Sequence, residues 1–386
     1  MPGVLQNLLV VSLEQAVAAP FCTQRLADAG ARVIKIERDG GETARHYDAT
    51  VHGTSAYFAW LNRGKESAVL DLKATQDKAL FEAMLEQADV LVQNLIPGAL
   101  ARMGLDAPTI ATRFPRLIVI NIFGYGLDTS YAGMRAYDML VQAESGVASV
   151  TGTPDQPCKI GVSAADIATG MTAFSAVLEA LIARSSTGRG QHVDVAMFDV
   201  LADWMSVPLL HLEQSGRTTL RYGLGHAAIY PYGPISCADG DVMVAVQSNG
   251  EWLRFCDVVL RTPRLAFDTR FATNPDRLAN REELDREIIV LVANLTVIEL
   301  IARLEEGQIA WGKLSTVQDL SAHPALRRVE VPLPDGTTVS MPRPPGRTAG
   351  FTSGAVPGVG TSTDRLRDEF SHHSAKQDQP SRVSQG

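Results

Sequence analysis

The chain has 386 residues, of which 45% are hydrophobic and 20% are charged, as in an ordinary globular protein with two domains or one large domain carrying an insertion. The formal charge is −8 and no block of Lys and Arg residues occurs, which excludes the charge pattern of a nucleic-acid-binding protein. The N-terminal segment lacks the features of a secretory signal, and no apolar run approaches the length of a membrane helix. We therefore expect a cytoplasmic protein that does not associate with membranes.

The first 126 residues alternate short apolar runs with helical patterns, which is typical of βαβ units and a parallel sheet. Pro20 suits the first turn of one helix and Gly30 suits its C-terminal end. A further crossover helix is predicted at residues 75–88. Strands are predicted at residues 8–13, 32–36, 67–72, 90–93 and 117–122. This half of the chain is expected to form a doubly wound, Rossmann-like α/β layer.

The pattern changes in the second half. From Ser163 apolar residues recur at helical spacing as far as residue 185, and a strand running into a helix is expected from residue 191. Beyond Gly216 the pattern predicts a hairpin around residues 238–241, followed by short helices. We expect a large domain at 1–215 completed by residues 325–371, a smaller α+β domain at 216–324, a linker at 341–347 and a disordered tail at 372–386.

Polar residues follow the predicted strands at the edge where ligands of open parallel sheets bind. Arg38 follows the second strand, Lys73 the third and Asn94 the fourth, and a glycine-containing loop follows the fifth. Two cations, an amide and a glycine loop would suit a phosphorylated ligand such as a nucleotide-containing cofactor. The alternative is that Arg38 and Lys73 are solvated loop residues without a ligand.

Asp166 stands three residues after Ser163, at the start of the long apolar helix. The S-x-x-D pattern is a capping box, and its usual role is structural. A carboxylate in the first turn also lies at the positive end of the helix dipole, which would keep it ionised and nucleophilic. Gly170, one turn later, would leave room for a ligand on the same face. Both interpretations of Asp166 stay open at this point.

The segment at residues 223–228 matches the G-x-G-x-x-A fingerprint, but no helix is predicted to follow it, so we do not expect dinucleotide binding. His226 in this segment is expected either near a pocket or in a turn without a role. The four cysteines lack CxxC spacing, and neither a zinc site nor a disulfide framework is indicated.

Six blocks of sequence, taken together and in order, resemble family III CoA-transferases and their racemase relatives. The blocks are LADAGARVIKIER after Ala19-Pro20, LNRGKES with LDLK, VQNLIPGALARMGL, AYDMLVQAESG, ADIATGM and GRGQHVDVAMFD. The segments GLGHAAIYPYG and RFATNPDR extend the resemblance toward residue 280. The resemblance implies a Rossmann-like large domain, a small domain between its two parts, and an interlocked homodimer.

The resemblance also implies roles for particular residues. The family's nucleophilic aspartate falls on Asp166. Coenzyme A, as part of an acyl-CoA substrate, is the implied cofactor, with no metal and no redox cofactor. Its contacts are expected at Arg38, Leu72, Lys73, Asn94, Arg102 and Met103, with Arg135, Tyr137 and Met197 lining the thioester region. Val17 and His226 are the residues expected on the substrate side.

Departures from the family pattern reduce the number of reactions and substrates that we expect for this chain. Formyl-CoA transferases carry a glutamine where Val17 stands and a run of glycines that this chain lacks, so formate and oxalate are not expected. Racemases carry a histidine in the stretch that reads here Ala136-Tyr137-Asp138-Met139, so the base for inverting an α-carbon is missing. We expect transfer of CoA to a short dicarboxylate such as mesaconate, itaconate, succinate or malate through an aspartyl-CoA thioester. The alternatives are a 2-methylacyl-CoA racemase or epimerase and a non-catalytic acyl-CoA-binding protein.

Overall fold

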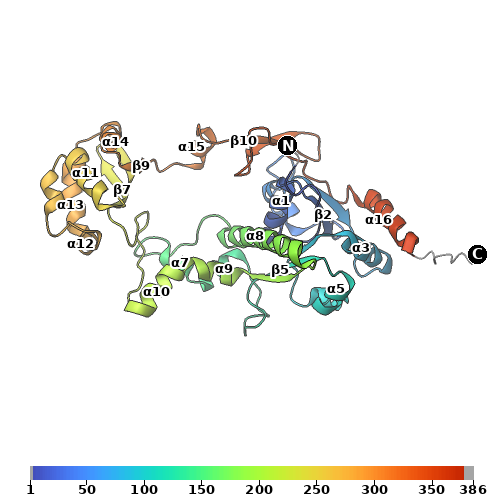
Figure 1. Cartoon of the computed structure of the whole chain (residues 1–386). Coiled ribbons are helices and arrows are strands. Elements are labelled where there is room, and N and C mark those ends of the chain that lie inside the picture. Colours follow the sequence, from blue (N-terminus) through green and yellow to red (C-terminus); the bar gives the residue numbers. More distant parts are fainter. Residues whose placement is uncertain (1–2, 378–386) are drawn as a thin grey trace, which may run out of the picture. The chain divides into compact units, whose positions relative to one another are not determined.

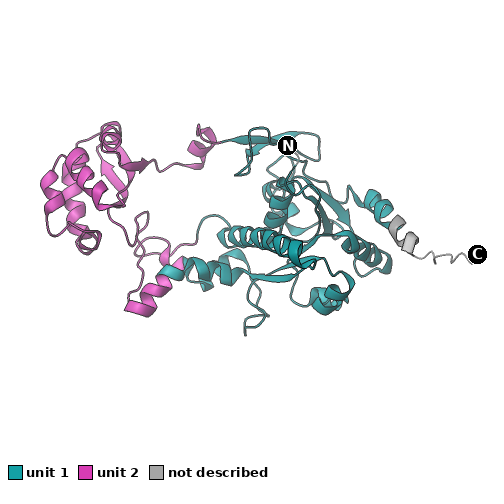
Figure 2. Cartoon of the chain, viewed as in Figure 1, with its two compact units in different colours: residues 1–147, 160–207, 327–386 teal, residues 148–159, 208–326 magenta. Residues whose placement is uncertain are grey.

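The structure is a computed structural model in which residues 3–377 are described. The chain divides into two compact units (Figure 2). Unit 1 comprises residues 1–147, 160–207 and 327–386, and unit 2 comprises residues 148–159 and 208–326. The tail predicted at residues 372–386 begins inside helix α16 (Thr363–Gln377), and its residues 378–386 lie outside the described part of the chain.

Unit 1 is built around a six-stranded sheet with the order β3-β2-β1-β4-β5-β6, in which every neighbouring pair is parallel. The strands are β1 (Leu9–Leu13), β2 (Arg32–Glu37), β3 (Lys65–Val69), β4 (Val90–Gln93), β5 (Ile118–Phe123) and β6 (His192–Ala196). Their apolar runs are buried on both faces, as in doubly wound sheets. The predicted Rossmann-like sheet is therefore confirmed.

Strand β3 begins two residues earlier than predicted and ends at Val69. It starts with a charged residue, Lys65, which an apolar pattern does not include. Lys65 pairs with Val33 of β2 and is buried, because its ammonium group reaches carboxylate and carbonyl oxygens behind the sheet. The strand therefore starts earlier than the hydrophobic pattern predicts, because its first residue is a lysine whose charge is buried in an ion pair with Glu14.

Helices cover both faces of the sheet (Figure 1). On one face α1 (Ala18–Asp28) and α8 (Ala164–Thr187) pack against each other and against the strands. The other face is covered by α3 (Thr75–Gln87), α5 (Ala107–Arg113) and α16. Leu366 and Phe370 of α16 are buried in this second cluster. The C-terminal segment therefore completes the layer that the N-terminal half begins.

Among the described residues, α8 has the length and apolar composition that a membrane-crossing helix needs. The sequence prediction that no apolar run approaches this length missed it. Ala173, Val177 and Ala180 of α8 are buried against the strands, as expected for the core helix of a sheet protein.

Unit 1 also contains shorter elements around the sheet. The antiparallel pair β10 (Arg328–Pro332) and β11 (Thr338–Pro342) packs its apolar residues against Phe58. Strand β11 takes up the first two residues of the predicted linker at 341–347. The other short elements are η1 (Thr43–His46), α2 (Ala56–Asn62), α4 (Ala99–Arg102), α6 (Asp138–Glu144) and α9 (Met197–Trp204). Helices α7 (Val147–Val150) and α10 (Ser206–Ser215) lie at the points where the chain passes between the units.

Unit 2 contains a three-stranded antiparallel sheet of β7 (Tyr232–Cys237), β8 (Gly240–Ala245) and β9 (Ala310–Gly312). The predicted hairpin is β7–β8. The helices are α11 (Asn249–Arg254), η2 (Phe255–Val259), η3 (Pro263–Phe267), α12 (Asn274–Ala279), α13 (Arg281–Val292), α14 (Val297–Glu306) and α15 (Val317–Ala322). Trp252, Phe255 and Phe271 lie in its core. The predicted combination of a parallel α/β layer and a smaller α+β part is confirmed.

Candidate active site

Asp166 lies in the first turn of α8, which packs against the start of α1 near Ala18. Gly170 lies one turn further along the same face of α8. A Cβ on Gly170 would lie 2.6 Å from the carbonyl oxygen of Ala18 and 2.9 Å from the Cβ of Phe21. The interpretation of Gly170 as room for a ligand is therefore wrong, because α1 occupies this space.

The N-terminus of α8 is capped by Asp138. Its carboxylate accepts hydrogen bonds from the backbone N–H of Ala165 at 2.8 Å and of Asp166 at 3.3 Å. Gln142 donates to the same carboxylate at 2.8 Å and holds it in place. Ser163 makes no side-chain cap, so the capping-box prediction is wrong. The cap comes from a residue 28 positions away, which a local pattern does not reveal.

Burial, followed by the like charge of Asp138, raises the pKa of Asp166 to about 7, and the nearby backbone N–H of Ala18 acts in the opposite direction. The sequence argument had expected the helix dipole to keep this carboxylate ionised. In the structure desolvation outweighs the dipole, so Asp166 titrates near neutral pH. A carboxylate with a raised pKa is a more basic and more nucleophilic group than an ordinary one, and such groups mark functional sites.

Aromatic side chains lie beside Asp166. Tyr47, Tyr57, Trp60 and Phe21 form a row of edge-to-face contacts with ring centroids 5.6 to 6.3 Å apart. The hydroxyl of Tyr57 lies 3.4 Å from Ser163 Oγ. Burial, then Glu42 and then Asp166 raise the pKa of Tyr47. Sequence reasoning missed this row, because its members are scattered over three elements and carry no common spacing.

The predicted CoA-binding residues lie mostly on loops and helix ends beyond the strands of unit 1. Arg38, Lys73, Arg102, Arg135 and Tyr137 are exposed, Leu72 and Met103 are partly buried against the core, and Met197 is buried. Arg38 donates to the carbonyl oxygen of Gly41 at 3.0 Å and to Thr43 Oγ1 at 3.4 Å, which uses two of its five N–H groups. The exposed cations are available to phosphates, and their contacts with CoA stay predictions.

Asn94 occupies a different position from the exposed cations. Its side-chain oxygen accepts from the backbone N–H of Gln15, and its amide nitrogen donates to the carbonyl oxygen of Gln15, both at 2.9 Å. The amide therefore fixes the chain segment that follows β1. Its predicted contact with CoA stays a prediction.

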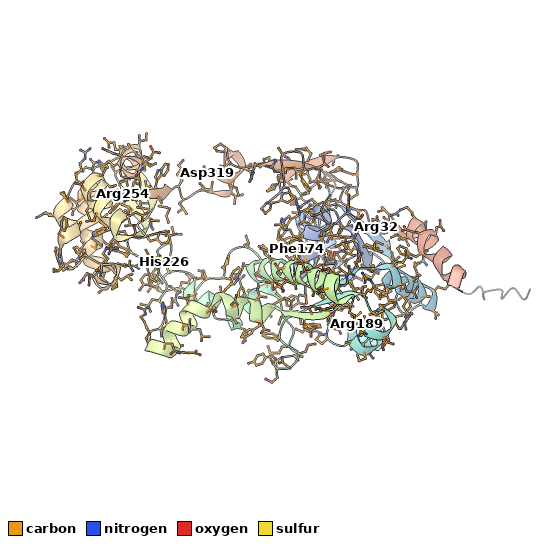
Figure 3. All side chains as sticks on the ribbon, viewed as in Figure 1. Arg32, Phe174, Arg189, His226, Arg254 and Asp319 are labelled. Carbon is orange, nitrogen blue, oxygen red and sulfur yellow. The ribbon has the colours of Figure 1, made fainter. Side chains whose placement is uncertain are left out.

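The two residues predicted on the substrate side differ in exposure. Val17 is 4% exposed and packs with Phe21 and Leu61, so its side chain offers little surface to a substrate. His226 lies in unit 2, where Figure 3 labels it. Its Nδ1 accepts from the backbone N–H of Ala228, and its ring lies 5.1 Å from that of Tyr232. Both substrate roles stay predictions.

A buried ionic network lies behind the segment that joins β1 to α1. Lys65 Nζ lies 2.7 Å and Lys35 Nζ 3.3 Å from Glu14 Oε1, and Lys35 also pairs with Glu42. All four side chains are at most 5% exposed. Burial opposes ionisation of Glu14, but the two lysines together outweigh it and lower its pKa to about 2. Sequence reasoning missed this network; the lysine inside the apolar strand RVIKIE is the signal that could have found it.

Within residues 3–377 no group of three or more His, Cys, Asp and Glu side chains could hold a metal ion.

Three comparisons with known proteins complete the description of the site. The sequence profile described as CoA-transferase family III matches residues 5–363. Among the solved structures that resemble this chain is that of a CAIB/BAIF family protein from Brucella suis, with a TM-score of 0.80, 32% identity, and coverage of 96% of this chain and 100% of that chain.

The curated relatives include three whose names state a CoA-transferase reaction. A succinate–glutarate CoA-transferase from Agrobacterium fabrum is 35% identical and covers 88% of both chains. An acetyl-CoA:oxalate CoA-transferase from Acetobacter aceti is 33% identical, with 97% of both chains covered. A succinyl-CoA:mesaconate CoA-transferase from Haloarcula hispanica is 32% identical, with coverage of 95% of this chain and 100% of that relative.

Proposed function

This chain belongs to CoA-transferase family III, and from this membership we propose that it moves CoA from an acyl-CoA donor to a short dicarboxylic acid through a covalent intermediate on Asp166. The family resemblance drawn from the six sequence blocks is thereby confirmed. The cytoplasmic location and the interlocked homodimer expected from the sequence are part of the same proposal.

The observation that carries the proposal is the environment of Asp166. Burial and a second carboxylate, Asp138, raise the pKa of its carboxylate to about 7. Burial without a neutralising cation raises the free energy of the ionised form. Acylation removes that charge, so covalent chemistry at Asp166 is favoured by the same desolvation that raises its pKa.

The proposed reaction has four bond exchanges. A carboxylate oxygen of Asp166 attacks the thioester carbon of the donor, the C–S bond breaks, and a mixed anhydride and CoA thiolate form. The thiolate then attacks the side-chain carbonyl carbon of Asp166, which releases the donor acid as a carboxylate and leaves an aspartyl-CoA thioester. The acceptor carboxylate attacks this thioester and displaces the thiolate, giving a second anhydride. Attack of the thiolate on the acceptor's carbonyl carbon restores the Asp166 carboxylate and releases the new acyl-CoA.

The surrounding residues assist this chemistry without taking up a proton. The backbone N–H of Ala18 lowers the pKa of Asp166 and so favours the ionised, nucleophilic form of its carboxylate. The aromatic rings of Tyr47, Tyr57 and Trp60 beside the nucleophile reduce the access of water to the anhydrides, which would otherwise hydrolyse. We assign the phosphates of CoA to the exposed cations Arg38 and Lys73.

The dicarboxylate specificity is supported by the relatives, whose names include succinate, glutarate, oxalate and mesaconate. Mesaconate and succinate were among the acids expected from the sequence. The sequence argument against oxalate rested on Val17, and a relative named for oxalate makes oxalate a necessary member of any substrate panel.

The test is substitution of the nucleophile. Asp166→Ala and Asp166→Asn should lower transfer from succinyl-CoA to a panel of mesaconate, itaconate, glutarate, malate and oxalate by about 10³-fold or more, because the covalent route is lost. Products are measured by mass spectrometry of acyl-CoA esters. Asp368→Asn, an exposed aspartate of α16, is the matched control and should retain wild-type activity.

Trapping with hydroxylamine separates the remaining alternatives. In the wild type with substrate present, hydroxylamine should convert the thioester to a hydroxamate at Asp166. A racemase would instead exchange the α-proton of a 2-methylacyl-CoA with deuterium when no acceptor acid is present. A non-catalytic protein would bind CoA and give no hydroxamate. Near-wild-type turnover by Asp166→Ala would refute the assignment.

A further inference from the structure

Gln142 lies in the last turn of α6 and is fully buried. Its side-chain amide contacts both the start of α6 and the segment that precedes α8. The nitrogen donates to Asp138 Oδ2 at 2.8 Å, and the oxygen accepts from the backbone N–H of Ile160 at 2.8 Å. The nitrogen also lies 3.5 Å from the carbonyl oxygen of Val162. Both ends of the amide are therefore used, and each holds a different part of the chain.

Both of these parts lead directly to Asp166. Asp138 Oδ1 accepts from the backbone N–H groups of Ala165 at 2.8 Å and of Asp166 at 3.3 Å. Ile160 is the residue at which the chain returns from unit 2 to unit 1, and α8 begins four residues later. The position of the first turn of α8 thus depends on a carboxylate and a chain segment that Gln142 holds.

The side chain at position 142 suits this place because it carries no charge. A glutamine offers a donor and an acceptor at once, which matches the needs of a carboxylate oxygen and of a backbone N–H. A lysine or arginine would also hold Asp138, but it would neutralise the charge that, after burial, raises the pKa of Asp166. The neutral amide fixes Asp138 and leaves its charge to act on Asp166.

We propose that Gln142 is a positioning residue for the nucleophile: its amide joins the Asp138 carboxylate to the segment at Ile160 and so fixes the turn of α8 that carries Asp166. This inference rests on the proposed role of Asp166. It assigns a part in the reaction to a buried glutamine that lies outside the nucleophile and the predicted CoA contacts. Because a nucleophile displaced by about 1 Å can lose about 100-fold in rate, loss of the amide should lower kcat more than it changes KM.

The titratable groups around this amide come from several elements. Asp138 on α6 and Asp166 on α8 are the carboxylates, and Tyr47 of η1 interacts with Asp166 and Tyr137. Lys159 is exposed in the segment that precedes α8. Helix α9 contributes apolar side chains to the same cluster, Met197 and Leu201. A titratable group introduced at position 142 would therefore meet Asp138 first.

The first variant is Gln142→Met in the full chain, which keeps the length of the side chain and removes both contacts. We expect kcat for transfer from succinyl-CoA to the best acceptor of the panel to fall about 10- to 100-fold, while KM for succinyl-CoA changes less than about 3-fold. Methionine does not titrate, so the ratio of variant to wild-type kcat should gain no new dependence on pH. Urea denaturation measures the loss of stability separately.

The second variant, Gln142→Glu, makes the contact with Asp138 depend on a proton. At about pH 6 the new carboxyl group, which faces Asp138 at hydrogen-bond distance, should be protonated, donate to Asp138 and keep most of the wild-type kcat. As the pH rises to about 9, this proton is lost and the two carboxylates repel each other, so the ratio of variant to wild-type kcat should fall about 10-fold or more. A loss of packing alone does not produce this fall at high pH.

Gln24→Met is the matched control. Gln24 is fully buried in α1 and donates to Asp28, four residues away, just as Gln142 donates to Asp138, four residues away. The variant removes the same kind of contact elsewhere in unit 1. It should leave kcat and its pH dependence unchanged.

The inference is overturned if folded Gln142→Met keeps the wild-type kcat, if the kcat ratio of Gln142→Glu does not depend on pH, or if Gln24→Met lowers kcat equally. If Gln142→Met does not fold, Gln142→Asn, whose amide is withdrawn by one methylene, takes its place with the same expected loss. Failure of the proposed function looks different, because Asp166→Asn would then keep the wild-type rate of transfer.

Discussion

Glu14, which is buried, and Asp166, which is partly buried, are two carboxylates of unit 1 whose pKa values shift in opposite directions. Glu14, at the end of β1, lies between Lys35 and Lys65, and its pKa falls to about 2 although burial opposes ionisation. Asp166, at the start of α8, has Asp138 as its charged neighbour, and its pKa rises to about 7. Burial raises the pKa of both acids, so the sign of the neighbouring charge decides the result.

The difference separates a structural carboxylate from a reactive one. Glu14 is compensated by two cations and by the hydroxyl of Thr23, and its charge fixes the strands around it. Asp166 has a backbone donor but no ammonium or guanidinium group among the influences on its pKa. An uncompensated charge costs folding free energy, and the chemistry proposed for Asp166 relieves that cost.

The largest expected effect comes from neutralising each acid in turn. Glu14→Gln leaves two buried lysines without their shared carboxylate and should lower the free energy of unfolding by about 3–5 kcal/mol at pH 8. Asp166→Asn removes a poorly compensated charge and should leave this free energy unchanged or raise it by about 1 kcal/mol. Urea denaturation of both variants measures the contrast. Equal losses in the two variants would contradict the distinction between the two carboxylates.

The pH dependence of stability follows from the same two shifts. The pKa of Glu14 is lowered on folding, so its contribution is present above the unfolded value of 4.5 and is lost as the pH falls toward 2. The pKa of Asp166 is raised on folding, so this group destabilises the folded protein at high pH. The loss of unfolding free energy begins as the pH rises above the unfolded pKa of 3.8 and is complete above about 7. Measurement at pH 8 therefore records the full effect of both groups.

A smaller effect is expected at Gly170, which allows α1 to approach Asp166. Gly170→Ala places a methyl group 2.6 Å from the carbonyl oxygen of Ala18, so the two helices must separate. We expect a loss of about 1–3 kcal/mol in unfolding free energy, together with a lower kcat because the Ala18 donor moves away. Gly161→Ala is the control, because a Cβ there meets no atom within 4 Å and its φ lies outside the left-handed region. Wild-type kcat in Gly170→Ala would show that close packing here serves stability alone.

The smallest effect is expected from Asp138, the like charge beside the nucleophile. Because the reaction requires the Asp166 carboxylate, wild-type kcat/KM should rise with pH through about 7. Asp138→Asn keeps an oxygen that accepts from the backbone of α8 and removes the negative charge that repels Asp166. The acidic limb of the pH–rate profile, which is the rise of kcat/KM with pH, should therefore move to lower pH by up to about one unit. The profile is measured with succinyl-CoA and mesaconate. A limb that stays near 7 would leave burial as the sole cause of the raised pKa.

Much of the fold could be predicted from local pattern. The buried parallel strands are continuous apolar runs, and β4 was placed at its observed bounds of Val90–Gln93. The start of β3 was misplaced because its first residue is the buried Lys65. A pattern of apolar residues predicts which hydrophobic side chains are buried. It cannot predict a buried lysine, because the partner of Lys65 lies 51 residues away along the chain.

The candidate nucleophile could be found from the sequence, but its surroundings could not. Position in the first turn of an apolar helix, together with the family resemblance, identified Asp166. The same reasoning assigned its cap to Ser163 and open space to Gly170, and the structure corrected both. Each of those features depends on another element, since Asp138 supplies the cap and α1 fills the space.

The sequence by itself therefore determined the parallel α/β layer, the family and the carboxylate proposed to react, because these depend on periodicity and on ordered blocks of residues. The tertiary structure decided how that carboxylate ionises and what holds it. The physical reason is that a pKa depends on burial and on charges a few ångströms away. Asp138 and Ala18 reach that distance from Asp166 through folding, although they lie far from it along the chain.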